Sequence, residues 1–169
     1  SRGNKMEGTR LKWVRFERAH PNSMWQLDGT QDEKGNWILP IEDDCSRYCL
    51  AIGKSKQMTT EIVIDLLEKA IAMHGKPREI LTDNGSVFGG RGKHSKFDRW
   101  CRRRGIEHIR TKVKRPQTNG KVERLFQTIK KETKLTNGDL ELFRMRYNHF
   151  RPHQSLHWLT PAQEFHRKL

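Results

Sequence analysis

The chain has 169 residues and a formal net charge of +14, from 34 Lys and Arg residues and 20 Asp and Glu residues. Hydrophobic residues make up 33% of the chain, which suits one compact domain of ordinary size. No run of 18 apolar residues exists and the first ten residues lack an apolar stretch, so neither a transmembrane helix nor a signal peptide is predicted. We expect an intracellular protein: cytoplasmic or nucleoid-associated in a prokaryote, nuclear in a eukaryote.

The first part of the chain predicts an arm and then an antiparallel meander. Residues 1–19 are basic and lack hydrophobic periodicity, so we interpret them as a linker before a core that spans 20–169. Three strands joined by tight turns are expected over residues 24–30, 37–43 and 48–53. The first of these strands ends near Asp28. Trp25 and Trp37 are expected in the core or at its rim.

A helix is predicted over residues 59–75. Thr59 or Thr60 can cap its start, and Gly75 ends it. Its expected apolar face consists of Ile62, Val63, Leu66, Leu67, Ala70, Ile71 and Met73.

Strands and helices alternate in the rest of the chain. The expected elements are a strand at 78–83, a flexible loop at 89–93, a helix at 97–104, a strand at 106–110, a loop at 112–120, an amphipathic helix marked by Val122, Leu125, Phe126 and Ile129, and a helix at 139–149. This order predicts an α/β fold with a mixed sheet, in which parallel strands follow the meander.

Three cysteines, Cys45, Cys49 and Cys101, are too few and too irregular for a disulfide framework or a zinc site. We expect them to be small buried or half-buried thiols.

Positive charge is concentrated between Arg91 and Lys134, a segment with 16 Lys and Arg residues and only four acidic residues. Such a field favours a polyanion, and nucleic acid is the usual one. A solvated surface or a patch for anionic lipid would also be basic. Membrane binding requires a bulky apolar face beside the cations, and no such helix stands out, so nucleic acid is the favoured partner.

Three carboxylates lie at the ends of predicted elements. Asp28 closes the first strand, Asp83 closes the fourth, and Glu123 lies in the first turns of the helix after the basic loop. Taken singly, each fits a turn or helix-cap role. Brought together, they would repel one another unless divalent cations intervened, and carboxylate oxygens suit Mg²⁺ or Mn²⁺. Two such ions can hold both the attacking and leaving oxygens in phosphodiester chemistry.

Four stretches make the chain resemble the catalytic cores of retroviral-type integrases and insertion-sequence transposases of the DDE group. They are H-P-N-S-M-W-Q-L-D-G-T (20–30), L-T-D-N-G-S-V-F (81–88), P-Q-T-N-G-K-V-E-R-L-F-Q-T-I-K (116–130) and Y-N-H-F-R-P-H-Q-S-L-H-W-L-T-P-A-Q-E-F (147–165). The third and fourth stretches are the most specific. Together they look more like the insertion-sequence branch than a retrovirus.

The resemblance implies an RNase H-like fold with a five-stranded mixed sheet flanked by helices. It also implies that Asp28, Asp83 and Glu123 form a catalytic triad that binds Mg²⁺ or Mn²⁺, with two ions expected when DNA is bound. The implied reaction is metal-dependent cleavage at an element end, followed by attack of the freed 3′-hydroxyl on target DNA. A homodimer or higher multimer on DNA is also implied.

The resemblance and the basic segment together give a set of candidate DNA-binding residues: Asn84, Lys112, Lys114, Arg115, Asn119, Lys121, Arg124, Gln127 and Lys130. Lys134 fits a solvated face better. For the closing segment with His149, Arg151 and His153 we favour a structural role, in which it folds back on the domain.

The chain departs from the family pattern in two places. Asp83 and Glu123 have 39 residues between them, where the family commonly has about 35. The excess falls in or near G-G-R-G-K-H-S (89–95), a loop in which insertions cost little. Nothing before residue 20 is long enough for the helix-turn-helix region of such transposases, so we expect a catalytic core without it. The alternatives are a domesticated, inactive DNA-binding or assembly module and an RNase H-type nuclease.

Overall fold

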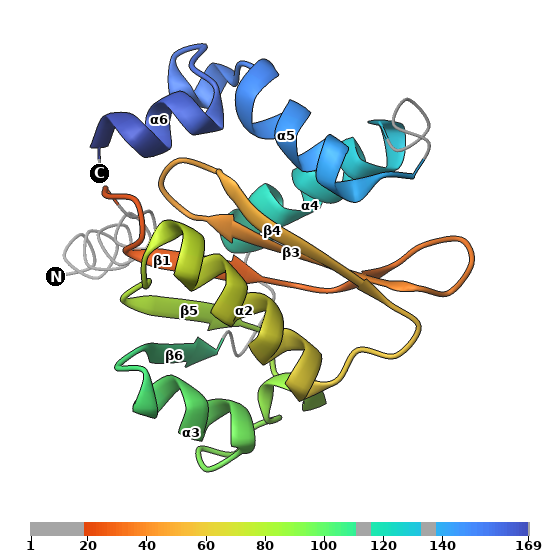
Figure 1. Ribbon diagram of the computed structural model, residues 1–169, viewed down its shortest axis with the longest axis vertical. Helices are drawn as coiled ribbons and strands as arrows, with labels where there is room; N and C mark the ends of the chain where they lie inside the picture. The colour runs from red at the N-terminus through yellow and green to blue at the C-terminus, as the bar shows by residue number, and fades with distance from the viewer. Residues whose placement is uncertain (1–18, 111–115, 133–137, 169) are drawn as a thin grey trace, which may run out of the picture.

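The computed structural model describes residues 19–110, 116–132 and 138–168 of the protein, with only the backbone described for 116–123 and 168. Its elements are β1 Met24–Leu27, β2 Thr30–Gln31, β3 Trp37–Asp43, β4 Cys49–Ser55, α2 Thr60–His74, β5 Glu79–Thr82, η1 Ser86–Phe88, α3 Lys96–Arg103, β6 Glu107–Arg110, α4 Pro116–Glu132, α5 Leu140–Phe150, η2 Gln154–Leu156 and α6 Pro161–Lys168. Figure 1 shows their arrangement. Within these residues, no helix is both long and apolar enough to cross a membrane.

The strands form one mixed sheet. β3 pairs antiparallel with β1 and with β4, which confirms the predicted meander. β5 and β6 then extend the sheet in parallel beyond β1. The short strand β2 pairs with β3 and brings the sheet to six strands, one more than the resemblance implies.

Strand β2 continues the line of β1 along the same edge of β3. Leu27 pairs with Ile41, and Thr30 pairs with Ile38, so the register does not shift between the two strands. One strand line is therefore interrupted only at Asp28 and Gly29. Because of this interruption, Asp28 lies outside the strand pairing with β3 that includes Leu27 and Thr30.

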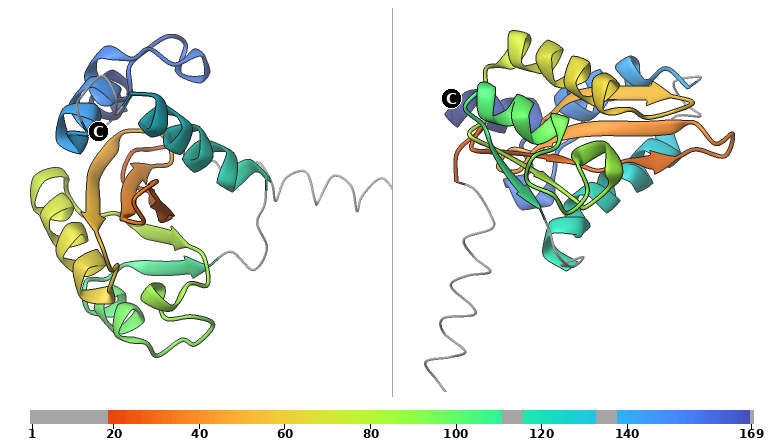
Figure 2. Two further views of the ribbon diagram at one scale, coloured as in Figure 1. Left: turned by 90° about the vertical axis from the view of Figure 1, so that its right-hand side faces the viewer. Right: turned by 90° about the horizontal axis from the view of Figure 1, so that it is seen from below.

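Helices cover both faces of the sheet (Figure 2). On one face, Trp25 and Ile80 pack with α2, α3 and α6 in the larger core cluster. On the other face, Cys49 of β4 packs with Leu125 of α4 and Phe143 of α5 in a smaller cluster. Alternate side chains of a strand point to opposite faces, so α4 lies across the sheet from α2.

Helix α2 confirms the predicted caps. The Thr59 side chain accepts a hydrogen bond from the Ile62 N–H, and Gly75 at the other end has a φ of 88°. Of the predicted apolar face, Val63, Leu67, Ala70 and Ile71 are buried. Met73 was placed wrongly on that face, because it is 72% exposed near the helix end.

The loop predicted at 112–120 was too long. Residues 112–115 lie outside the described residues, but α4 already begins at Pro116. Proline suits the first helical position, since it fixes φ and lacks only an N–H that has no intrahelical partner there. The Asn119-Gly120 pair, interpreted as a turn, lies inside the helix.

The thiols and tryptophans agree with expectation. Cys49 and Cys101 are buried, Cys45 is half-buried, and none forms a disulfide. Trp25 is fully buried, and Trp37 is half-buried at the start of β3.

The closing segment folds back on the sheet, as predicted. The buried Asn148 side chain of α5 accepts a hydrogen bond from Cys49 N (2.8 Å) and donates one to Cys49 O (2.8 Å). Arg144 also donates to Cys49 O (3.1 Å). These bonds occupy both backbone polar groups of Cys49 at the start of β4.

We expect Asn148→Ala to destabilise the protein by about 2–3 kcal/mol. The Cys49 N–H would lose its partner inside the core, whereas Cys49 O would keep the bond from Arg144. Urea denaturation measures the change, with the exposed neighbour His149→Ala as control. Equal stability of the two variants would contradict this role of Asn148.

Candidate active site

Two of the three predicted carboxylates follow neighbouring parallel strands. Asp28 comes directly after β1, and Asp83 comes directly after β5. The strand register pairs Gln26 with Leu81. Continued by two residues, it places Asp28 opposite Asp83 at the carboxyl ends of both strands. Neighbouring strands lie about 4.8 Å apart, so the fold brings these two residues together.

The backbone turn after β5 fixes one oxygen of Asp83. The Gly85 N–H donates a hydrogen bond to Asp83 Oδ1 (2.7 Å), while the Asp83 side chain remains exposed. A Cβ at Gly85 would lie 2.8 Å from that oxygen, so only glycine allows this close approach. The Asp-Asn-Gly sequence thus acts as an Asx turn that orients the carboxylate.

The third carboxylate, Glu123, belongs to α4, and its side chain lies outside the described residues, as do those of Asn119 and Lys121. Lys112, Lys114 and Arg115 lie wholly outside them. Among the side chains that are described, no group of three His, Cys, Asp or Glu is arranged to hold a metal ion. The Glu123 side chain is not among them, so the triad stays a prediction.

The described DNA-binding candidates on α4 are exposed and divide between two pockets. Arg124 and Gln127 line a pocket of about 240 Å³. Lys130 lines another, of about 470 Å³, beside β2. Asn84 is half-buried and lines a larger pocket of about 710 Å³ next to Asp83.

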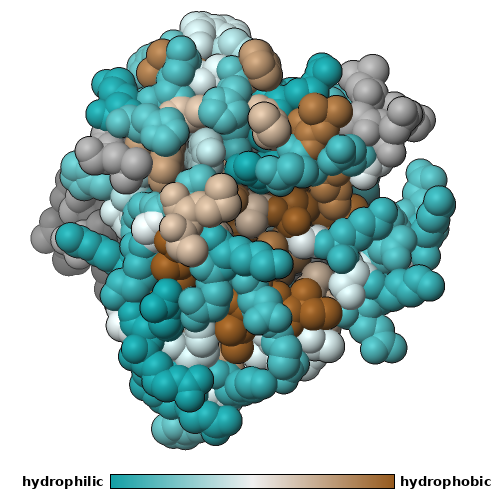
Figure 3. Space-filling view, in the orientation of Figure 1, coloured by the Kyte–Doolittle hydropathy of each residue, from teal (hydrophilic) through white to brown (hydrophobic). Residues whose placement is uncertain are grey.

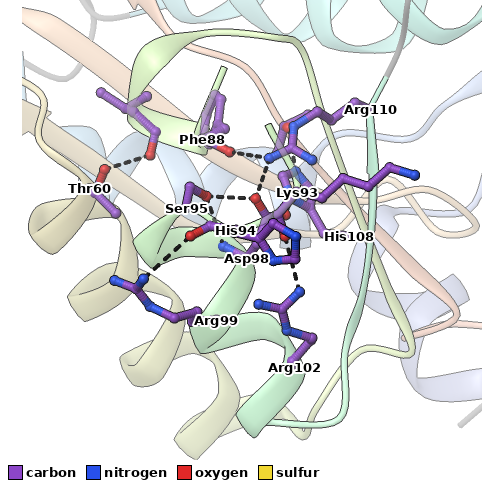
Figure 4. Close-up of polar contacts among 12 residues, drawn as sticks. Thr60, Phe88, Lys93, His94, Ser95, Asp98, Arg99, Arg102, His108 and Arg110 are labelled. Carbon is purple, nitrogen blue, oxygen red and sulfur yellow. Dashed lines mark hydrogen bonds and ion pairs between the residues drawn. The ribbon is translucent and has the colours of Figure 1, made fainter. Parts of the chain in front are cut away.

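A buried polar network supports the strand end that carries Asp83 (Figure 4). Asp98 of α3 contacts His108 Nδ1 through Oδ1 (2.8 Å) and accepts hydrogen bonds from Arg110 Nη2 and Ser95 Oγ through Oδ2 (2.6 Å each). His108 Nε2 in turn lies 2.7 Å from Thr82 Oγ1, which is 2.9 Å from the Asp83 carbonyl oxygen. A continuous chain of polar contacts therefore joins α3 to the Asp83 backbone.

The environment of this network lowers the pKa values of both Asp98 and His108. Burial by itself raises the pKa of Asp98, but hydrogen bonds from Arg110, Ser95 and His108 outweigh burial and hold the pKa well below its usual range. Burial lowers the pKa of His108 despite the neighbouring Asp98. Asp98 is therefore ionised, and the lowered pKa of His108 favours its neutral imidazole.

The sequence contains two signals for this network, and neither was recognised before the fold was known. S-K-F-D (95–98) is a capping box, in which the Ser95 side chain accepts from Asp98 N and donates to the Asp98 carboxylate. His108 and Arg110 are two residues apart on β6, so they share one face of the strand.

The fold, with carboxylates after two neighbouring parallel strands, defines an RNase H-like α/β protein. The chain belongs to the integrase core domain family: one family model of that description matches residues 18–116, and a second matches residues 104–161. The resemblance inferred from the sequence motifs is thus confirmed.

Relatives come from mobile elements and retroviruses. The chain is 30% identical over 156 residues to an insertion element IS476 protein of Xanthomonas euvesicatoria, with 85% of this chain and 44% of the relative covered. It is 30% identical over 113 residues to the Gag-Pro-Pol polyprotein of squirrel monkey retrovirus, covering 65% of this chain and 6% of the polyprotein. The chain therefore spans less than half of either relative.

Solved structures confirm the fold. The HTLV-2 integrase catalytic core domain in complex with magnesium superposes with a TM-score of 0.70 at 24% identity, covering 88% of this chain and all of that one. A chain of the simian T-cell lymphotropic virus intasome gives a TM-score of 0.76 at 24% identity, covering 89% of this chain and 56% of that one.

Proposed function

We propose that this chain is the catalytic core of a DNA transposase or integrase, which cuts a DNA strand at an element end and joins the freed 3′ end to target DNA. The observation that carries the proposal is the parallel pairing of β1 with β5 in a member of the integrase core domain family, since Asp28 directly follows β1 and Asp83 directly follows β5. Members of that family are polynucleotidyl transferases.

The donor atoms at this edge of the sheet fit a magnesium ion. Asp28 and Asp83 present carboxylate oxygens, the ligands that Mg²⁺ and Mn²⁺ prefer, and Asp83 is exposed. Glu123 of α4 would complete the set. When bound, such ions lower the pKa of an attacking water or hydroxyl and stabilise the departing 3′-oxygen. The magnesium bound to the HTLV-2 integrase core is consistent with this choice.

The residues of the chain then have separate roles. Asp28, Asp83 and Glu123 would hold the metal ions, and the Asx turn at Gly85 keeps one Asp83 oxygen fixed. The basic residues beside them hold the DNA backbone, so that the scissile phosphate meets the nucleophile in line. The proposed DNA contacts are Asn84, Lys112, Lys114, Arg115, Asn119, Lys121, Arg124, Gln127 and Lys130. We further propose that the chain works as a homodimer or higher multimer.

Incubation with branched DNA tests this function. A substrate that mimics the joined product of element end and target should be resolved in the presence of Mg²⁺ or Mn²⁺ and left intact with EDTA. A nuclease of the RNase H type would instead cut an RNA–DNA hybrid, so a hybrid of the same sequence serves as the control substrate.

The same assay distinguishes an active transposase or integrase core from the alternative that has no catalytic activity. An inactive DNA-binding or assembly module would bind the branched DNA in a salt-sensitive manner that ignores divalent metal. Binding without metal-dependent resolution, in a preparation that is folded, would refute the proposed activity.

A further inference from the structure

The loop after β5 carries more residues than the family pattern requires, and the structure gives this loop a fixed shape. Gly89 has a φ of 96°, and a Cβ there would lie 2.1 Å from Ser95 Oγ, so the two ends of residues 89–95 pack directly on each other. Arg102 donates a hydrogen bond to Lys93 O (3.0 Å), and Arg99 donates one to His94 O (3.3 Å). Side chains of α3 therefore hold the loop by its backbone.

The base of the loop is held as well. Arg110 Nη2 donates to Phe88 O (2.9 Å) and to the Asp98 carboxylate, and Thr60 Oγ1 donates to Val87 O (2.7 Å). These bonds connect the loop to β6, α3 and α2 (Figure 4). Charged side chains that interact only with solvent would not require a loop backbone held by so many hydrogen bonds.

Cations gather where this loop meets α3 and β6. The pocket of about 710 Å³ that Asn84 lines is also lined by Arg91, Lys93, Arg102 and Arg110, and by two acidic residues, Asp98 and Glu107. Both oxygens of Asp98 already accept hydrogen bonds or contact His108 within the network. The pocket thus has an excess of positive charge.

Several cationic groups of the pocket remain available to a ligand. Arg91 and Lys93 are exposed, and Figure 4 shows the Lys93 side chain extending away from the network. Arg102 is exposed as well. In Figure 3 the surface over α3 and the preceding loop is hydrophilic, as expected for a surface that binds a polyanion rather than an apolar partner.

We propose that the loop 89–95 and α3 form a binding site for the phosphodiester backbone of duplex DNA, in which Arg91, Lys93 and Arg102 contact phosphate groups at the pocket that Asn84 also lines. The inference rests on the proposed function for the identity of its ligand. It assigns a role to the additional residues of the loop. Guanidinium groups suit this ligand because they can bind phosphate oxygens in pairs.

The salt dependence of DNA binding tests this site. Each phosphate contact contributes about 0.9 to the slope of log K against log salt concentration. We expect the double variant Arg91→Gln/Lys93→Gln to reduce the slope by about 2. Within the described residues neither side chain makes a hydrogen bond or ion pair, so the variant should keep the thermal stability of the wild type.

The matched control is Lys69→Gln/Arg78→Gln, which removes the same charge from exposed residues of α2 and of the segment before β5 that do not line the pocket. This control should leave the slope unchanged. An equal reduction in both double variants, or none in the first, would overturn the proposed site.

Two DNA probes separate the possible sources of the phosphates. A short linear duplex of mixed sequence presents ends, and a closed circular plasmid presents only internal duplex. A reduced slope with both probes assigns the site to internal duplex such as target DNA, whereas a reduction with the linear probe alone assigns it to DNA ends. All binding is measured in EDTA, so a chain without strand-transfer activity still gives a result for this site.

Discussion

Asp83→Asn and Glu123→Gln should each reduce metal-dependent resolution of branched DNA by about a thousandfold or more. Each change replaces a carboxylate oxygen that we propose as a metal ligand by an amide group of nearly the same size. Stabilisation of charge by a bound metal ion contributes several kcal/mol at the transition state, and about 1.4 kcal/mol corresponds to a factor of ten in rate. The rate of product formation under saturating Mn²⁺ measures the loss.

These variants should keep the fold and the affinity for DNA. Asp83 is exposed, and an asparagine oxygen can still accept the hydrogen bond from Gly85 N. The control is Asp65→Asn, the same chemical change at an exposed residue of α2, which should resolve branched DNA at the rate of the wild type. Undiminished activity in either Asp83→Asn or Glu123→Gln would remove that residue from the triad.

Local sequence patterns were sufficient for most of the fold. The strand from Trp37 to Asp43 and the helix capped by Thr59 were predicted within a residue or two, because a short apolar run between turns and a capping residue are signals that span only a few positions. The start of α4 at Pro116 was missed, because an Asn-Gly pair signals a turn locally but can be accommodated inside a helix.

Predicting the candidate site required two kinds of information: local sequence patterns and the spatial order of the elements. Asp28 and Asp83 were chosen because they end predicted strands, but only the strand order reveals that β1 and β5 are neighbours in parallel. The Asp98 network joins residues from α3, β5 and β6, and no local pattern specifies which of them meet. Likewise, the loop cations could be counted in the sequence, whereas their position in one pocket with Asn84 follows from the fold.

The Asp98 network provides the second large expected effect. Asp98→Ala should destabilise the protein by about 3–5 kcal/mol, because Arg110 would keep a largely buried positive charge without its partner. For a chain of this length each kcal/mol corresponds to about 2–4 °C in melting temperature, so a decrease of about 6–20 °C is expected. Asp65→Ala on the exposed face of α2 is the control, with little change expected.

The pH dependence of this loss has a definite sign. The folded pKa of Asp98 lies below its unfolded value, so its stabilising effect is present above the unfolded pKa, about 4, and is lost as the pH falls through the folded pKa. The stability difference between the wild type and Asp98→Ala should therefore be large at pH 7 and shrink below about pH 4. Urea denaturation over this range measures it. A stability difference between the wild type and Asp98→Ala that increased as the pH fell would contradict this account. It would show that Arg110, Ser95 and His108 do not hold Asp98 as a carboxylate, and that the turn carrying Asp83 has another support.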